Sequence, residues 1–203
     1  MEILIADKSH SIYASIICET IAESANVRGT GIAKRTPEYI ISKMEKGNAV
    51  IALEADKFVG FCYIESWGHG KFVANSGLIV HPDFRGKGYA KQIKQKIFEH
   101  SRIKFPKAKV FSITTGLAVM KMNSDLGYKP VTFSELTDDQ TFWKGCQTCK
   151  NYDVLQRTEQ SMCLCTGMLY DPNLKDAKST VKPGVFQRLK KIKQARFLKK
   201  NKK

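Results

Sequence analysis

Two closely spaced glycines in a basic segment are the residues whose type and spacing best define a chemistry. The segment reads Arg85-Gly86-Lys87-Gly88-Tyr89-Ala90 and follows the apolar run Leu78-Ile79-Val80. The residues after it have helical periodicity, with an apolar face formed by Ala90, Ile93, Ile97 and Phe98. Glycines at the start of a helix let the backbone approach a ligand, and the N–H groups of the first turn point toward it. The pattern predicts a strand, a turn and a helix that bind an anion, most naturally a phosphate. A tight connection with exposed basic side chains is the alternative.

Four cysteines in two close pairs form a second motif. Cys146 and Cys149 are separated by two residues, and the pair Cys163 and Cys165 follows after thirteen more. Two such pairs can place four thiolates around a tetrahedral zinc ion, so we predict a structural zinc site. Free thiols, disulfides or a metal cluster are the alternatives.

The composition is that of a soluble globular protein. The chain has 203 residues, of which 42% are hydrophobic and 26% charged. No apolar run is long enough to cross a bilayer and the N-terminus does not resemble a signal peptide, so we expect a cytoplasmic protein. The net charge of +15 is concentrated in residues 182–203, which contain ten Lys or Arg and no Asp or Glu and leave +5 for residues 1–181.

The periodicity of apolar residues predicts the elements that position the two motifs. Strands are expected near residues 1–6, 49–53, 58–66, 72–80, 109–115 and 128–133, and helices near 11–24, 36–47, 90–98 and 117–126. The order β-α-α-β-β-β-α-β-α-β indicates a mixed α/β domain. We expect a core at residues 1–135, a Cys-rich segment at 136–170 that completes the domain, a linker at 171–182 and a basic tail at 183–203. The tail has the spacing of a basic amphipathic helix, which could bind an anionic partner or pack on its own domain.

The glycine segment resembles the coenzyme A loop of the GNAT family of N-acyltransferases, which reads Q/R-x-x-G-x-G/A. Arg85, Gly88 and Ala90 match this pattern, and the expected order of elements is that of the GNAT fold. The resemblance implies that acetyl-CoA is the co-substrate and that the backbone of residues 85–90 holds its pyrophosphate. It also implies that the thioester lies along Leu78-Ile79-Val80, where N–H groups polarise its carbonyl.

Other stretches resemble the acetyltransferase domain of N-acetylglutamate synthases, a branch of this family. Residues 31–40 are similar to the pattern G-x-L-x-x-R-S/T-x-E, in which an arginine holds the carboxylate of the substrate, and Arg35 matches that arginine. Residues 151–158 resemble a segment in which another arginine and a hydroxyl contact the amino acid, which implies Arg157 and Thr158. Guanidinium suits this task because it pairs two N–H donors with two carboxylate oxygens. The Cys-rich segment would anchor the strand expected to carry Arg157.

The chain departs from the family pattern at two positions that concern proton transfer. Many members carry a tyrosine acid near the end of the fourth helix, where this chain has Asn123 followed by Ser124. Asparagine can hydrogen-bond the coenzyme but cannot donate a useful proton, so Ser124 is the candidate acid. The synthase branch carries a glutamate in the strand before the coenzyme loop, where this chain has Ala74-Asn75-Ser76. Glu65 and His69 are therefore the candidate bases.

These features predict a coenzyme A-dependent N-acetyltransferase that acts on a small acidic amino acid, with glutamate in arginine biosynthesis as the expected substrate. One alternative is a protein or ribosome-associated acetyltransferase that the basic tail brings to an anionic partner. The other is a non-catalytic acyl-CoA-binding module, which the missing tyrosine and glutamate would explain.

Overall fold

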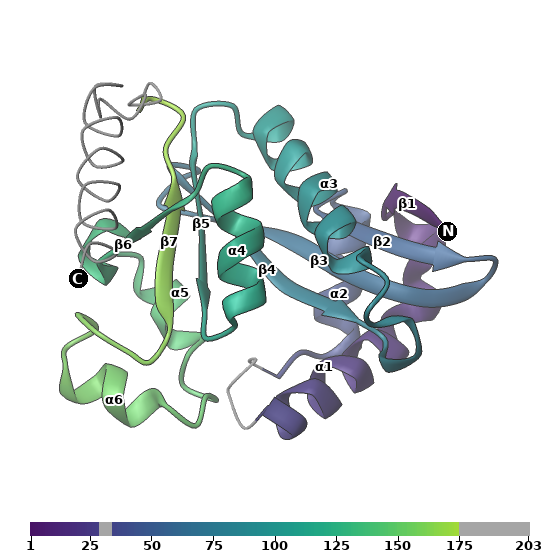
Figure 1. The fold of residues 1–203 in the computed structure, drawn as a ribbon, viewed down its shortest axis with the longest axis horizontal. Coiled ribbons are helices and arrows are strands. Elements are labelled where there is room, and N and C mark those ends of the chain that lie inside the picture. Colours follow the sequence, from purple (N-terminus) through teal and green to yellow (C-terminus); the bar gives the residue numbers. More distant parts are fainter. Residues whose placement is uncertain (29–33, 175–203) are drawn as a thin grey trace, which may run out of the picture. The chain divides into compact units, whose positions relative to one another are not determined.

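The computed structural model describes residues 1–28 and 34–174, and within them seven strands form one sheet in the order β1-β2-β3-β4-β5-β7-β6 (Figure 1). The strands are β1 (Glu2–Ile5), β2 (Ala49–Glu54), β3 (Lys57–Trp67), β4 (Phe72–Val80), β5 (Lys109–Thr114), β6 (Lys129–Val131) and β7 (Thr166–Tyr170). Strands β1 to β4 are antiparallel neighbours, β4 and β5 are parallel, and β7 lies antiparallel between β5 and β6. The α/β class predicted from the sequence is confirmed.

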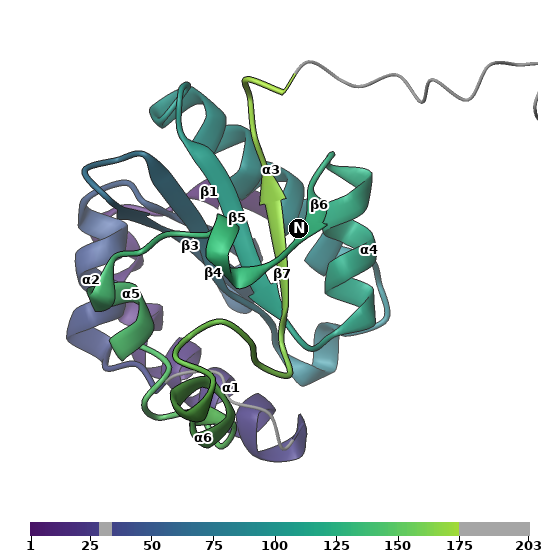
Figure 2. The same ribbon diagram turned by 90° about the vertical axis from the view of Figure 1, so that its left-hand side faces the viewer.

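Helices cover both faces of the sheet. They are α1 (Ala14–Arg28), α2 (Pro37–Glu45), α3 (Tyr89–Lys104), α4 (Leu117–Asp125), α5 (Gln140–Lys144) and α6 (Tyr152–Arg157), with short 3₁₀ helices at Lys8–Tyr13, Pro82–Phe84 and Phe133–Glu135. Figure 2 shows α1 and α2 on one face and α3 and α4 on the other. Each face of the sheet has its own hydrophobic core. Ile17 and Ile40 pack with Phe61 on one face, and Ile93 and Val110 pack together on the other.

Strands β4 and β5 separate before either of them ends. Their pairing runs from Phe72 opposite Lys109 to Ala74 opposite Phe111, and the described register includes no pair from Asn75 onward. A parallel pair with a splayed end exposes backbone groups that a ligand can bind. The gap between the two strands is therefore the part of the fold best suited to a site.

A bulge in β4 lies beside this gap. In the pairing of β4 with β3, Gly77 and Leu78 together oppose Cys62, which is the arrangement of a β-bulge. Gly77 has a φ of 65°, and a Cβ atom there would lie 2.3 Å from the ring of Tyr63, so only glycine fits. The bulge turns backbone groups of β4 out of the regular ladder next to the gap.

Residues 136–170 differ most from the expected structure. They form α5, α6 and β7, and β7 enters the sheet between β5 and β6. The expectation that Arg157 lies on a strand is wrong, because Arg157 is the last residue of α6. The helix forms since Tyr152 and Leu155 are three residues apart and Leu155 is buried against the sheet.

The chain divides into two compact units, Met1–Pro172 and Asn173–Lys203. The basic tail at 183–203 and all but the start of the expected linker at 171–182 lie outside the described residues. In the described part of the chain, no helix combines the length and apolar character required to cross a membrane.

Candidate active site

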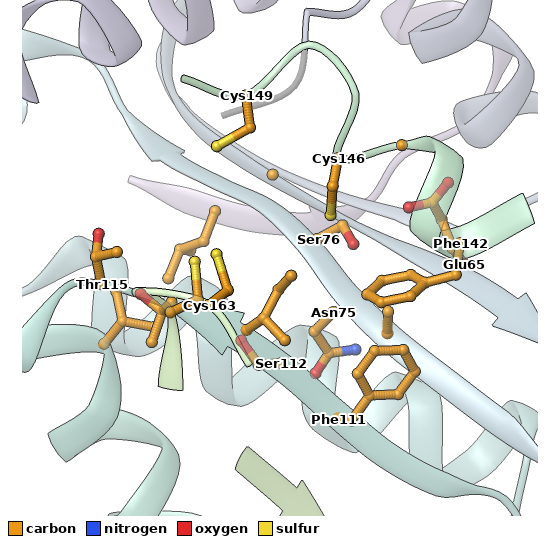
Figure 3. A pocket seen from close by; sticks show the side chains of 18 of the residues that line it. Glu65, Asn75, Ser76, Phe111, Ser112, Thr115, Phe142, Cys146, Cys149 and Cys163 are labelled. Carbon is orange, nitrogen blue, oxygen red and sulfur yellow. The ribbon is translucent and has the colours of Figure 1, made fainter. Parts of the chain in front are cut away.

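A cavity of about 680 Å³ lies where β4 and β5 separate. Its walls come from both strands, from the segment that leads into α2, from the start of α4 and from the α5–α6 region (Figure 3). The predicted site residues that line it are Arg35, Glu65, Leu78, Cys146, Cys149, Cys163 and Cys165. The charged side chains of the lining, Lys34, Arg35 and Glu65, come from β3 and the segment before α2, whereas the α5–α6 wall carries none.

Arg35 is held in a fixed orientation at the cavity. It precedes Thr36, whose hydroxyl accepts from the Tyr39 backbone N–H and caps α2. The Arg35 Nε donates to the Tyr63 hydroxyl at 2.7 Å, and Nη1 donates to the Lys34 carbonyl at 3.1 Å. The guanidinium carbon also lies 5.1 Å from the ring centre of Tyr39 and 5.9 Å from that of Tyr63. These contacts preorganise a cation that can pair with a carboxylate.

Glu65 lies on β3 beside this cation. Its Oε1 accepts from the Tyr39 hydroxyl in a short hydrogen bond and from Lys43 Nζ at 3.5 Å, and the side chain is 12% exposed. Burial, together with Tyr63 and Glu65, raises the pKa of Tyr39, so its phenol stays protonated and donates. Burial also raises the pKa of Tyr63 to about 12, as does the Glu65 carboxylate. Glu65 is thus a carboxylate held among neutral phenols, with room to accept a proton from a bound amine.

The predicted coenzyme loop connects β4 to α3. Gly86 and Gly88 both have a φ of 79°, a conformation that other residues rarely adopt. Gly88 is the N-cap of α3 and no side chain caps this end, so the N–H groups of the first turn can bind a ligand. Arg85 fixes the loop, because its Nε donates to the Val80 carbonyl at 3.1 Å and its Nη2 donates to Ser24 Oγ at 2.8 Å. The loop has the geometry of an anion site.

The other residues predicted to contact the coenzyme have mixed surroundings. The Leu78 side chain lines the cavity, whereas those of Ile79 and Val80 are buried in the two cores. Lys87 is exposed, with its Nζ 5.3 Å from the ring centre of Phe84, and Tyr89 and Ala90 are half-buried against the core. The backbone of these residues, rather than their side chains, is suited to bind the coenzyme.

Residues 18–116 match the sequence model of the acetyltransferase (GNAT) family. The matched segment is a GNAT domain and spans just under half of the chain. The fold of the chain also resembles solved structures of other acetyltransferases. N-acetylglutamate synthase from Neisseria gonorrhoeae, complexed with coenzyme A and N-acetyl-glutamate, matches with a TM-score of 0.61 and 16% identity over 84% of this chain. The match covers 34% of that protein, so this chain spans about a third of its length.

Two further structures match along nearly their whole length. Rv2747 from Mycobacterium tuberculosis, in complex with CoA, has a TM-score of 0.58 and 15% identity over 84% of this chain and 99% of its own. Ribosomal-protein-alanine N-acetyltransferase from Brucella melitensis has a TM-score of 0.56 and 12% identity over 84% of this chain and 99% of its own. No curated protein sequence matches this chain. At these identities the structures establish the GNAT fold and leave the substrate open.

The other predicted proton-transfer residues of this GNAT domain lie away from the cavity. His69 is exposed at the turn between β3 and β4, with a φ of 55°, and Ser124 is exposed near the end of α4. Asn123 is fully buried, with its Nδ2 3.6 Å from the Met168 sulfur. None of the three lines the cavity, and their roles as acid, base or coenzyme contact stay predictions. Asn123 faces inward because this side of α4 packs on β7.

The four cysteines of the predicted zinc site line the cavity of the GNAT domain. Figure 3 shows that Cys146, Cys149 and Cys163 point into it from different sides. Burial raises the pKa of Cys146 to about 11 and that of Cys165 to about 12, and the neighbouring thiols add to both shifts. Among the described residues, no group of three or more His, Cys, Asp or Glu side chains is placed to hold a metal ion. The zinc prediction is therefore not supported.

Arg157 and Thr158, predicted to bind the substrate, are also outside the cavity lining. Arg157 is exposed at the end of α6. The Thr158 hydroxyl donates to the Val154 carbonyl at 2.8 Å and accepts from the Met162 N–H at 3.3 Å, so it closes the loop after the helix. Their separation from Arg35 follows from the helical conformation of residues 152–157.

Tyr39, Tyr63 and Lys43 are site residues that the sequence prediction missed. A signal for two of them existed, because Lys43 lies four residues after Tyr39, which places both side chains on one side of α2. Tyr63 lies two residues before Glu65, which places both on one face of β3. This end of the cavity is thus lined by two cations, by Glu65 and by the Tyr39 phenol, while Tyr63 bonds to Arg35 and Lys43 bonds to Glu65.

Proposed function

We propose that this protein transfers the acetyl group of acetyl-CoA to the amine of a small acidic amino acid, with glutamate as the first candidate and arginine biosynthesis as its role. The observation that carries the proposal is that one cavity joins Arg35 and Glu65 to the bulged, splayed end of β4. A carboxylate-binding cation, a base and a thioester-binding strand are the three parts that the reaction needs.

The donor half uses the backbone of β4 and the glycine loop. The pyrophosphate of the coenzyme binds at the start of α3, where Gly86 and Gly88 leave N–H groups unobstructed. The pantetheine arm enters between β4 and β5, which brings the thioester to the bulge at Gly77 and Leu78. An N–H group aimed at the thioester oxygen stabilises the negative charge that develops there, an effect typically worth about 3 kcal/mol.

The acceptor half uses Arg35 and Glu65. Arg35 pairs with the α-carboxylate, and Lys34, which also lines the cavity, is available to a second carboxylate. Glu65 takes one proton from the ammonium of the substrate, and the neutral amine attacks the thioester carbon. The new C–N bond forms as the C–S bond breaks, coenzyme A leaves as a thiolate, and the second proton of the nitrogen passes to solvent. The likeness to N-acetylglutamate synthase in complex with N-acetyl-glutamate supports glutamate as the acceptor.

A thiol-release assay with acetyl-CoA and a panel of amino acids tests this proposal. We expect turnover with glutamate, and we expect Arg35→Ala to raise its KM by about 10- to 100-fold, because a charge-assisted hydrogen bond is worth about 1.5–3 kcal/mol. Arg157→Ala is the matched comparison, since Arg157 is exposed and does not line the cavity. Glutamate turnover that is unaffected by Arg35→Ala would contradict the proposal.

A second candidate is acetylation of a protein N-terminus. The ribosomal-protein-alanine N-acetyltransferase among the structural neighbours and the ten basic residues of segment 182–203 favour it. Deletion of residues 183–203 separates the two candidates. A small-substrate enzyme should keep its kcat and KM after the deletion, whereas an enzyme recruited to an anionic partner should lose activity on that partner and become less sensitive to salt.

A further inference from the structure

Lys94, on α3, is a buried cation that the proposed reaction does not yet use. Lys94 is 1% exposed. No other Lys, Arg, Asp or Glu among the described residues is buried. None of the ion pairs found in the described ranges includes it. A buried ammonium without a carboxylate is costly to the fold, so its presence calls for an explanation.

The Lys94 ammonium lies directly behind the point where β4 and β5 separate. Its Nζ donates to Asn75 Oδ1 at 3.2 Å, and Asn75 is the first residue of β4 beyond the last pair with β5. The Tyr128 hydroxyl donates to the same oxygen at 3.0 Å, and Asn75 Nδ2 donates to Ser101 Oγ at 2.8 Å. Asn75 also lines the cavity (Figure 3), so its side chain lies between the charge and the cavity proposed for the thioester.

We propose that Lys94 is a positioning residue for acyl transfer, whose buried ammonium, held against Asn75, favours negative charge on the sulfur of bound coenzyme A. The inference rests on the proposed function, because it requires the coenzyme to enter between β4 and β5. In this proposal a charge on α3, rather than a proton from Asn123 or Ser124 on α4, stabilises the leaving thiolate.

The groups around Lys94 leave its charge without a counter-ion. Cys62 on β3 and Tyr128 face it, and burial raises the pKa of Cys62 to about 11 and that of Tyr128 well above its usual value, so both stay neutral. The ring centre of Tyr128 lies 4.9 Å from Nζ, and the charged residue near Tyr128 is Arg102, a second cation. Burial lowers the pKa of Lys94 to about 8, so the ammonium predominates at neutral pH. A thiolate in the cavity would therefore meet a charge that no carboxylate pairs with in the described ranges.

The acidity of bound coenzyme A tests the inference without any turnover. The probe is free coenzyme A saturating the full chain, and the readout is the ultraviolet absorbance of its thiolate as a function of pH, with the ligand-free protein subtracted. Below pH 8, where Lys94 is charged, we expect the thiolate fraction of bound coenzyme A in the wild type to be about tenfold that in Lys94→Met, because an opposite charge nearby favours the ionised form. Lys94→Gln should behave like Lys94→Met, since glutamine can donate to Asn75 but carries no charge. Lys96→Met is the control, because Lys96 is exposed on the same helix.

Turnover provides the second readout. With acetyl-CoA and the best amine of the panel, we expect kcat to fall about tenfold in Lys94→Met while the KM for acetyl-CoA changes less than about twofold, as for an interaction made mainly in the transition state. Equal thiolate fractions below pH 8 in wild type, Lys94→Met and Lys94→Gln would overturn the inference. A wild-type protein that binds no coenzyme A would refute the proposed function itself, so the two failures are distinct.

Discussion

The burial of Lys94 should make the free energy of unfolding depend on pH in a measurable way. Burial lowers the pKa of Lys94 from its usual 10.5 to about 8. Below pH 8 the lysine is charged in both states, and burial of that charge destabilises the folded protein. At about 1.4 kcal/mol for each pH unit, the difference of about 2.5 units corresponds to about 3 kcal/mol. Between pH 8 and 10.5 the unfolded chain binds more protons than the folded one, so the free energy of unfolding rises with pH in this window.

Urea unfolding at several pH values measures this effect in wild type and Lys94→Met. Methionine has a similar volume and no charge, and Asn75 keeps its hydrogen bond from Tyr128. We expect Lys94→Met to be about 1 to 2 kcal/mol more stable at pH 7, because removal of the charge gains about 3 kcal/mol and loss of the hydrogen bonds to Asn75 and Tyr128 costs about 1 to 2 kcal/mol. The difference should shrink as the pH rises to 10.5. Lys96→Met controls for the loss of an exposed lysine. Parallel stability curves for wild type and Lys94→Met would refute the reasoning.

Three further outcomes are expected. Glu65→Gln should lower kcat about 100-fold with little change in the KM for acetyl-CoA, and an unchanged kcat would exclude Glu65 as the base. Gly88→Ala should weaken coenzyme A binding about tenfold in calorimetry, because an alanine in the left-handed conformation costs about 1–2 kcal/mol. Gly47 also has a positive φ but follows α2, so Gly47→Ala should leave coenzyme A binding unchanged. Acetyl-CoA should slow the alkylation of Cys163, which lines the cavity, but not that of Cys18, which does not; equal protection of both would contradict this cavity as the acetyl site.

The coenzyme loop was predictable because its residues are contiguous. A strand, two glycines and a helix are adjacent in sequence, so spacing alone placed Gly86 and Gly88 at the start of α3. Arg35 and Glu65 are 30 residues apart, and their meeting in one cavity depends on the register of β3 and on how α2 packs on the sheet. The family pattern, rather than periodicity, brought Arg35 into the prediction.

The α5–α6 region shows where the sequence prediction failed. The cysteine spacing fits a zinc site equally well whether the segment between the pairs is a loop, a strand or a helix, so spacing could not place the thiols. The segment folds as α6, and this places the cysteines around a cavity and Arg157 at an exposed helix end. The insertion of β7 between β5 and β6 is a long-range pairing that depends on the packing of Phe111 and Leu169, which no local pattern indicates.

Lys94 was visible in the sequence as an exception to a pattern. The apolar face of α3 includes Ala90 and Ile97, and Lys94 lies four residues after the first and three before the second, so it falls within that face. A lysine there can extend its ammonium to solvent, which is the usual arrangement. The structure shows instead that the ammonium ends at Asn75, because the sheet covers this part of the helix. The position of Lys94 within the apolar face of α3 was therefore the sequence signal for a charged group in the core.

The surroundings of the leaving group connect these observations. Asn123 is buried against Met168 and Ser124 is exposed away from the cavity, so the described end of α4 supplies no proton to the departing sulfur. A thiolate that leaves unprotonated needs a positive potential, and a fixed buried charge provides one without reorganisation during the reaction. Lys94 meets this need through Asn75 at a cost to stability of about 3 kcal/mol, a trade between stability and activity that is common at functional sites. The missing acid and the buried lysine are then two consequences of one mechanism, in which charge replaces proton transfer at the sulfur.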